Sequence, residues 1–261
     1  VICDSTNALQ AGRSVTEGRV AQGLNEAIQR CEGRAVVGCF SSNIARIQTL
    51  SKIAADTGRY LGILGRSAAG MANCAQQVGL FPDQFKPIHG EHLGYLPPRE
   101  VLAIATGSQG ESGAALHRLV AQTHPHLSLD AGDTVILSSR TIPGNEASVA
   151  RLIEGFRARG IHVLEADSSD TPLHASGHPY QDELRDLYQL LKPSLVVPVH
   201  GEAAHMAANA RIAKQAGASA ALTGVNGDLF YLSPVPGVRR RYAPVGRLQW
   251  CEDTERLINV T

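Results

Sequence analysis

Short runs of branched and small apolar residues alternate with longer amphipathic stretches along most of the chain. The runs have the length and composition of buried strands, and they lie at residues 1–3, 34–40, 59–64, 100–106, 133–138, 161–165 and 194–199. Between them, apolar positions recur with the spacing of one helix face at about residues 14–31, 44–54, 66–78, 114–122, 145–159, 180–191 and 202–215. Two short closing strands are expected at 219–222 and 229–232. This alternation predicts an α/β fold in which helices cover both faces of a mostly parallel sheet.

One stretch of the chain concentrates side chains that can take part in chemistry. Residues 173–178 read L-H-A-S-G-H, and residues 194–202 read S-L-V-V-P-V-H-G-E. The second segment delivers His200 at the carboxyl end of a buried strand, which is where α/β folds bind their ligands. A lone histidine at a strand end is usually structural, but the preceding loop adds His174, Ser176 and His178. Together these groups favour a functional site.

Polar turns after two other predicted strands add candidates. Asp4 follows the first strand directly, a position suited to a catalytic carboxylate, although D-S-T-N is also ordinary turn sequence. Ser42 belongs to a strand–turn–helix connection of the kind that presents backbone N–H groups to a phosphate, although this is also the ordinary connection of a βα unit. Arg46 lies one turn inside the helix that follows and is expected to face the same site.

Two histidine pairs and one glycine-rich turn give weaker signals. The pairs His89/His92 and His124/His126 lie in irregular stretches, and we expect them to be loop residues rather than metal ligands. The turn Gly107–Glu111 matches neither a nucleotide-binding loop nor a serine nucleophile elbow. It therefore specifies no cofactor.

Composition narrows the classes of function. Lys and Arg together number 24, as do Asp and Glu, so any binding of an anion must come from the local placement of charge. The five cysteines are widely spaced and form no C-x-x-C pair, which fits reduced thiols in a cytoplasmic protein. No apolar run has the length of a membrane span, and we expect neither a membrane segment nor a signal peptide.

Six short motifs occur along the chain in a characteristic order. They are D-S-T-N (4–7), F-S-S-N-I-A-R (40–46), G-S-Q-G-E (107–111), I-P-G-N (142–145), H-A-S-G-H with P-V-H-G-E (174–178 and 198–202) and N-G-D (226–228). In this order they resemble the ribonuclease J family, which are β-CASP nucleases with a metallo-β-lactamase fold. The resemblance implies a β-CASP domain at residues 8–165, inserted into a metallo-β-lactamase domain that contributes residues 1–7 and 166–235. Residues 236–261 would form a C-terminal extension.

The same resemblance implies roles for individual residues. Asp4 and His178 would be catalytic, with His178 near the scissile phosphate and Asp4 positioning it. His200 would bind one of two zinc ions, which activate water and stabilise the charge that develops on a phosphodiester. RNA phosphates would be contacted by Ser42, Arg46, His174 and Ser176.

The zinc site that the resemblance implies is incomplete in this sequence. The family's H-x-H-x-D-H motif, a further histidine and an aspartate in a G-D-F turn are missing, and the one H-x-H is at His124 to His126. A single imidazole, that of His200, cannot hold a catalytic zinc. We therefore expect this chain to be the downstream part of its parent protein and to be inactive by itself. We also expect it to expose apolar surface after residue 166, which the missing segment would cover.

Three functions fit the sequence. The first is a zinc-dependent ribonuclease that hydrolyses RNA phosphodiesters as a 5′ exonuclease, as an endonuclease or as both. The second is a non-catalytic β-CASP module that holds RNA or a partner protein, and the third is a metallo-hydrolase of a small phosphoester. We expect RNA as the partner, and we leave open whether the protein forms a homo-oligomer.

Overall fold

The computed structural model describes residues 1–81, 85–166, 169–251 and 256–260. The chain forms two compact units: a central unit, Val15–Ser176, and a terminal unit that combines Val1–Ser14 with Gly177–Thr261. The two unit boundaries follow residues 14 and 176, so both lie later in the chain than the boundaries after residues 7 and 165 that the sequence led us to expect. Residues 8–14 join the terminal unit because the carbonyl groups of Gln10 and Gly12 accept hydrogen bonds from the first helical turn after residue 180.

The central unit is built on one sheet of five parallel strands in the order β3-β4-β2-β5-β6. The strands are β2 (Ala35–Gly38), β3 (Tyr60–Leu64), β4 (Val101–Ala105), β5 (Thr134–Leu137) and β6 (His162–Glu165). The helices are α1 (Glu17–Gln29), α2 (Ile44–Asp56), α3 (Arg66–Gln77), α4 (Ala115–Val120) and α5 (Glu146–Arg157), with short 3-10 helices η1 (Gly90–Tyr95) and η2 (Pro98–Glu100). Each strand and each α-helix corresponds to one that the apolar pattern predicts.

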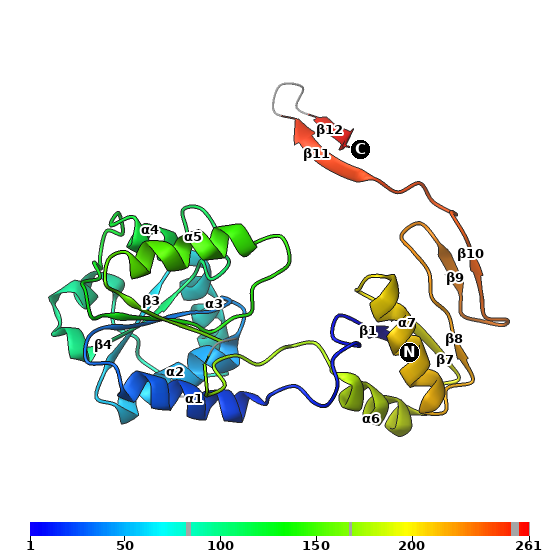
Figure 1. The fold of residues 1–261 in the computed structure, drawn as a ribbon, viewed down its shortest axis with the longest axis horizontal. Helices are drawn as coiled ribbons and strands as arrows, with labels where there is room; N and C mark the ends of the chain where they lie inside the picture. The colour runs from blue at the N-terminus through cyan, green and yellow to red at the C-terminus, as the bar shows by residue number, and fades with distance from the viewer. Residues whose placement is uncertain (82–84, 167–168, 252–255, 261) are drawn as a thin grey trace. The chain divides into compact units, whose positions relative to one another are not determined.

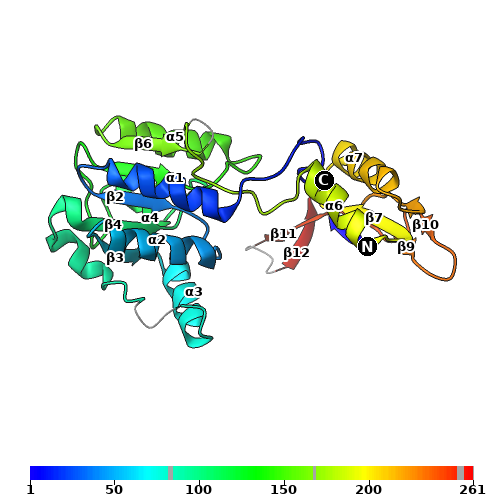
Figure 2. The same cartoon turned by 90° about the horizontal axis from the view of Figure 1, so that it is seen from below.

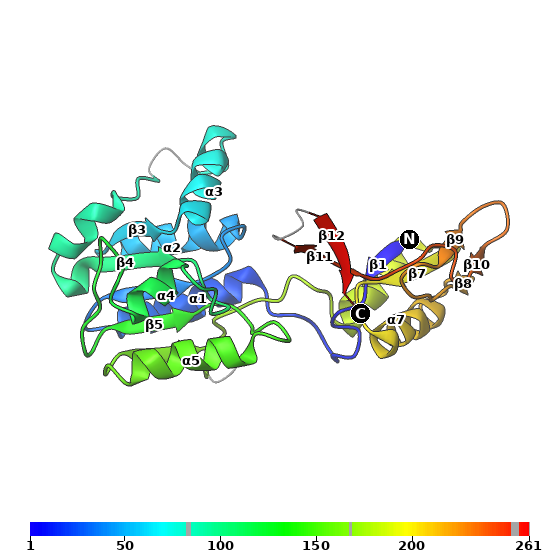
Figure 3. The same ribbon diagram turned by 90° about the horizontal axis from the view of Figure 1, so that it is seen from above.

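Helices cover both faces of this sheet (Figure 1). Val37, Ile104 and Ile136 pack with α1, α2 and α3 on one face, whereas Val36 and Val135 pack with α4 and α5 on the other. Figures 2 and 3 show the same two helical layers from below and from above. Every residue of β2, β4 and β5 is buried, which is why these strands are nearly continuous apolar runs in the sequence.

The terminal unit contains a small parallel sheet in the order β1-β7-β8, made of β1 (Ile2–Asp4), β7 (Leu195–Val199) and β8 (Ala220–Ala221). Helices α6 (Gln181–Leu191) and α7 (Ala203–Gln215) share a core with it (Figure 1). Two antiparallel pairs follow, β9 (Leu229–Tyr231) with β10 (Gly237–Arg239) and β11 (Arg247–Cys251) with β12 (Arg256–Val260). The sequence pattern does not predict β10, β11 or β12.

The terminal unit exposes large apolar side chains, and the covering of this surface by a further segment stays a prediction. Ile2 on β1 is 64% exposed and Leu232 is 51% exposed. Both line a groove of about 360 Å³, to which Leu195 and Val197 of β7 also contribute. None of the helices in the described part of the chain combines the length and the apolar character that crossing a bilayer requires.

The segment that leads out of the central unit packs closely on α1, and Gly23 makes this contact possible. A Cβ atom at position 23 would lie 2.2 Å from the carbonyl oxygen of Pro172. On the same helix, a Cβ atom at Gly18 would meet nothing closer than Thr16 Oγ1 at 3.9 Å. The two glycines therefore form a matched pair, one constrained by packing and one unconstrained.

We expect Gly23→Ala to lower the free energy of unfolding by about 2–3 kcal/mol, because the backbone of Pro172 would have to move. Gly18→Ala should instead raise it by up to about 1 kcal/mol, because alanine favours the helix. Urea unfolding of both variants tests this. Equal stability of the two variants would contradict the close packing of residue 172 on α1.

Candidate active site

Three polar side chains from distant parts of the chain meet at one edge of the small sheet. Asp4 ends β1, and His200 directly follows β7. The two strands are parallel neighbours in which Asp4 lies opposite Val199, so their carboxyl ends reach the same edge. His178 comes from the loop before α6. The structure thus brings together the three residues that the sequence places at the chemical centre.

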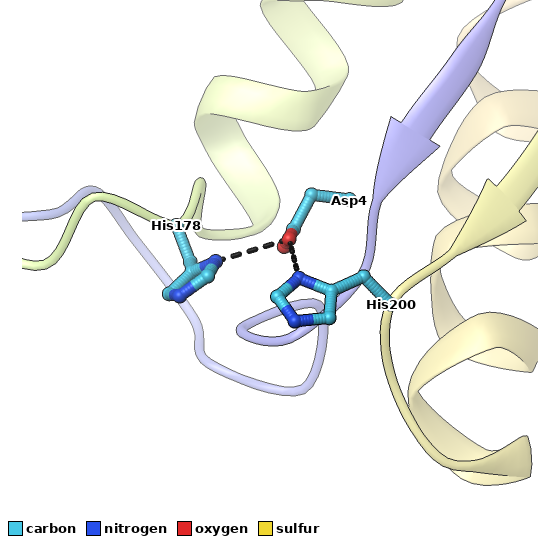
Figure 4. Close-up of side chains that lie close together, drawn as sticks. All are labelled: Asp4, His178 and His200. Atoms are coloured by element: carbon cyan, nitrogen blue, oxygen red, sulfur yellow. Dashed lines mark hydrogen bonds and ion pairs between the residues drawn. The ribbon is translucent and has the colours of Figure 1, made fainter. Parts of the chain in front are cut away.

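One carboxylate oxygen of Asp4 contacts both imidazoles (Figure 4). Its Oδ2 lies 3.0 Å from Nδ1 of His178 and 2.5 Å from Nδ1 of His200. The centroids of the two rings are 5.3 Å apart. Because both histidines face Asp4 through Nδ1, their Nε2 atoms point away from the carboxylate.

The Asp4 carboxyl group is ionised at neutral pH. Partial burial by itself would raise its pKa, but hydrogen bonds from His200, the Thr6 N–H and His178 outweigh burial and hold the pKa below its ordinary value. The Thr6 N–H donates to Oδ1 at 2.9 Å, whereas both imidazoles contact Oδ2. The site therefore contains a carboxylate that can support a positive charge on either ring.

The turn after β1 also holds the two segments that carry the histidines. The Thr6 hydroxyl donates to the carbonyl oxygen of His200 at 3.0 Å, and the Asn7 side-chain amide donates to that of His178 at 3.1 Å. His200 has a φ of +57°, a left-handed conformation that few residues other than glycine adopt. Backbone conformations of this kind gather at functional sites, where the surrounding contacts maintain them.

A buried chain of hydrogen bonds from α6 and α7 fixes the backbone of Asp4. The side-chain amide of Asn209 on α7 donates to the carbonyl oxygen of Asp4 at 2.9 Å and to Ser5 Oγ at 3.0 Å. Its oxygen accepts a hydrogen bond from the Tyr188 hydroxyl at 2.5 Å. Asn209 and Tyr188 have no exposed surface. Sequence reasoning missed both, because polar atoms on amphipathic helices carry no signal of what they contact.

The chemistry of the three side chains fits part of a metal site. Among the described residues, Asp4, His178 and His200 form the one group of three whose ligand atoms lie close enough to hold an ion, all within 4.8 Å of one another. Metal-binding histidines commonly donate their second ring nitrogen to a carboxylate, as His200 does to Asp4. A catalytic zinc takes about three protein ligands, so further ligands would have to join this cluster.

All four residues expected to contact RNA lie in the central unit. Ser42 is exposed in the turn before α2, and His174 and Ser176 are half-buried near the end of the unit. Nδ1 of His174 lies 3.3 Å from the carbonyl oxygen of Ser138. Burial and the positive charge of Arg46 lower the pKa of His174, so its ring is neutral at neutral pH.

Arg46 does not face a ligand, contrary to the expectation from the sequence. Its side chain is fully buried, and Nε and Nη2 donate to the Glu17 carboxylate at 3.1 and 3.0 Å. Nη1 donates to Ser138 Oγ and, at 3.3 Å, to the carbonyl oxygen of Leu173. A phosphate could not reach this guanidinium without opening the core. Arg46 instead fixes the start of the loop that carries His174 and His178.

Two family models match the sequence. A model described as "Ribonuclease J, beta-CASP domain" matches residues 32–156, which lie within the central unit. A second, described as "Zn-dependent metallo-hydrolase RNA specificity domain", matches residues 171–222, which include His178 and His200. The parallel sheet with helices on both faces fits a β-CASP domain, and the fold class expected from the sequence is confirmed.

Curated relatives match this chain over most of its length. Ribonuclease J of Sinorhizobium meliloti is 40% identical over 249 residues, which cover 95% of this chain and 44% of the relative. The ribonuclease J of Mycolicibacterium smegmatis is 38% identical over 217 residues, or 83% of this chain and 38% of the relative. The ribonuclease J of Thermus thermophilus is 38% identical over 205 residues, which cover 78% of this chain and 35% of the relative. The chain thus spans less than half the length of each of these relatives.

Removal of the Arg46 guanidinium should destabilise the central unit. We expect Arg46→Met to lower the free energy of unfolding by about 2–4 kcal/mol, because Ser138 and the carbonyl group of Leu173 would lose a buried charged donor. Arg151→Met on α5, where an exposed arginine donates to Ser148 Oγ, should change it by about 0.5 kcal/mol or less. Chemical unfolding gives both values, and hydrogen exchange at residues 173–176 should accelerate in Arg46→Met alone. Unchanged exchange there would contradict the positioning role.

Loss of the Asn209 amide should shift the backbone of Asp4, although no hydrogen bond within the described residues joins Asn209 to His178 or His200. We expect Asn209→Leu to lower the free energy of unfolding by about 3 kcal/mol, because Tyr188, Ser5 and the Asp4 carbonyl would lose a buried partner. Gln215→Leu, an exposed amide on the same helix, is the control and should change it by about 0.5 kcal/mol or less. The imidazole NMR signals of His178 and His200 should shift in Asn209→Leu only. If they stay in place, the Asn209 chain does not position Asp4.

Proposed function

This chain belongs to the ribonuclease J family, and we propose that it carries part of the active site of a zinc-dependent ribonuclease that hydrolyses RNA phosphodiesters. The observation that carries the proposal is the Asp4 carboxylate held between Nδ1 of His178 and Nδ1 of His200. The names of the relatives and the metallo-hydrolase description of residues 171–222 support the class of reaction.

His200 is the proposed zinc ligand, and it would bind through Nε2. Zinc ions bound at such a site activate a water molecule and stabilise the charge that develops on the phosphodiester. Asp4, on Nδ1 of His200, orients the ring and makes Nε2 more basic. The remaining ligands come from outside the cluster of Asp4, His178 and His200, because one imidazole is too few for a catalytic zinc.

His178 is the proposed proton donor to the leaving oxygen. Its Nδ1–H donates to the ionised Asp4, which stabilises the positively charged ring. The proton on Nε2, the nitrogen that points away from Asp4, is then placed for transfer to the alkoxide that leaves. Its 40% exposed side chain leaves room for a substrate to approach.

The proposed contacts to RNA phosphates are the hydroxyl groups of Ser42 and Ser176 and the neutral ring of His174. These are hydrogen-bond donors without formal charge, and they suit a chain whose acidic and basic residues balance. Arg46 would act only through the loop that it holds. Cleavage from the 5′ end, cleavage at internal sites or both are compatible with this arrangement.

The test uses the complete product of the gene that encodes this chain. We expect about two zinc ions per chain by elemental analysis and cleavage of RNA. His178→Ala should lower kcat about a hundredfold or more with zinc content unchanged, because it removes the proton donor. His200→Ala should remove both zinc and activity, and Asp4→Asn should lower activity about 10- to 100-fold. His162→Ala, an exposed histidine on β6, is the control and should behave as the wild type.

Other outcomes select other functions. A protein that holds RNA but binds no zinc and cleaves nothing would be a non-catalytic RNA-binding module. One that hydrolyses bis(p-nitrophenyl) phosphate but not RNA would be a hydrolase of small phosphoesters. Cleavage of a circular RNA, which has no 5′ end, separates endonuclease from exonuclease action.

A further inference from the structure

A cavity of about 1280 Å³ opens at the carboxyl ends of β3 and β4 in the central unit. Its walls come from the end of β3, one side of α3, the turn before α4 with the start of that helix, and the segments 87–90 and 124–126. The carboxyl edge of a parallel sheet is where α/β folds bind ligands. The volume exceeds the roughly 300–1,000 Å³ of ordinary small-molecule pockets, so the cavity has room for an extended ligand. None of the residues assigned above to catalysis or RNA contact lines it.

Two arginines in the walls of this cavity have no partner in the described part of the chain. Arg66 on α3 and Arg118 on α4 are exposed, and neither guanidinium makes a hydrogen bond or an ion pair with a described residue. The acidic side chain in the lining is that of Glu111, whose carboxylate accepts a hydrogen bond from the backbone N–H of Gln109 within its own turn. The walls therefore carry a net positive charge.

Three histidines add polar ring nitrogens to the walls of this cavity. His89, His124 and His126 line the cavity, and the rings of His124 and His126 have centroids 6.0 Å apart. Burial lowers the pKa of His124, and the nearby positive charges of His126 and Arg118 lower it further. His124 is therefore an uncharged hydrogen-bonding group at neutral pH. None of these histidines belongs to a group of three ligands close enough to hold a metal among the described residues.

We propose that this cavity binds the phosphate groups of single-stranded RNA, with Arg66 and Arg118 as the charged contacts. This inference rests on the proposed function, which makes RNA the substrate. Two unpaired guanidinium groups on separate helices suit successive phosphates of a chain better than one compact anion. The α3 N-terminus, at which Arg66 stands, adds to the positive potential. Apart from the histidines, the lining holds one aromatic ring, the buried Phe85. The site would therefore recognise the charge of the phosphates and not the identity of the bases.

The test measures RNA affinity at several salt concentrations. The probe is a fluorescein-labelled oligouridylate of about 12 nucleotides, read by anisotropy with the wild-type chain and with the double variant Arg66→Gln/Arg118→Gln. We expect the double variant to bind about 10-fold more weakly at about 50 mM salt. The plot of log K against log salt concentration has a negative slope, and we expect that slope to become shallower by about 1.4. Both positions are exposed, and neither guanidinium has a partner among the described residues, so the variant should unfold at the same urea concentration as the wild type.

A charge-matched control comes from the opposite edge of the sheet. Arg99→Gln/Lys52→Gln removes two exposed positive charges, one before the amino end of β4 and one on α2, outside the cavity lining. It should change the affinity less than twofold. An equal loss in both double variants would assign the effect to net charge and overturn the proposal.

The remaining outcomes separate this inference from the proposed function. If the gene product cleaves RNA but Arg66→Gln/Arg118→Gln binds RNA as tightly as the wild type, the cavity proposal alone fails. If the gene product cleaves no RNA and the wild-type chain binds none, both fail. A last outcome concerns competition by uridine monophosphate. If it displaces the oligonucleotide as effectively as unlabelled oligouridylate does, and does so only when Arg66 and Arg118 are present, the cavity binds a free nucleotide. That result would overturn the proposal that it binds an RNA chain.

Discussion

The Asp4 carboxylate is the interaction on which the geometry of the site depends. It lies 174 residues from His178 and 196 residues from His200 in sequence, yet one of its oxygens contacts both rings. Parallel pairing of β1 with β7 brings the first and last of these positions to one sheet edge, and Asn209 holds the Asp4 backbone there. Because the same Oδ2 atom faces two Nδ1 atoms, both rings must turn Nε2 outward. One carboxylate therefore sets the direction of both Nε2 atoms.

The loop that carries His174 and His178 is fixed separately at its two ends. In the central unit, Arg46 and Ser138 bind the carbonyl group of Leu173. In the terminal unit, Asn7 binds the carbonyl group of His178. Each end is thus held by a side chain that touches no substrate in the proposed reaction.

Most of the fold is readable from the sequence because its central strands are buried on both faces. A continuous apolar run such as 101–105, flanked by stretches of helical periodicity, is typical of a strand in the middle of a parallel sheet. The strands β11 and β12 were missed because most of their described side chains are exposed and mix arginine with leucine and tryptophan. Asp4, His178 and His200, which the structure brings together, could be singled out because they lie in polar segments near strand ends and in motifs of characteristic order. The burial of Arg46 could not be foreseen, since its partners Glu17 and Ser138 are 29 and 92 residues away.

The arginines of the central unit show why a net charge of zero says little about binding of RNA. Arg46 is saturated by Glu17, Ser138 and Leu173, and Arg59 donates to four backbone carbonyl groups in the core. Such groups are part of the packing, and burial lowers the pKa of Arg59 without making it available to a ligand. Arg66 and Arg118 count equally in the composition but have no such partners in the described part of the chain. What distinguishes a structural arginine from a phosphate-binding one is the state of its five donors, and that is visible only in three dimensions.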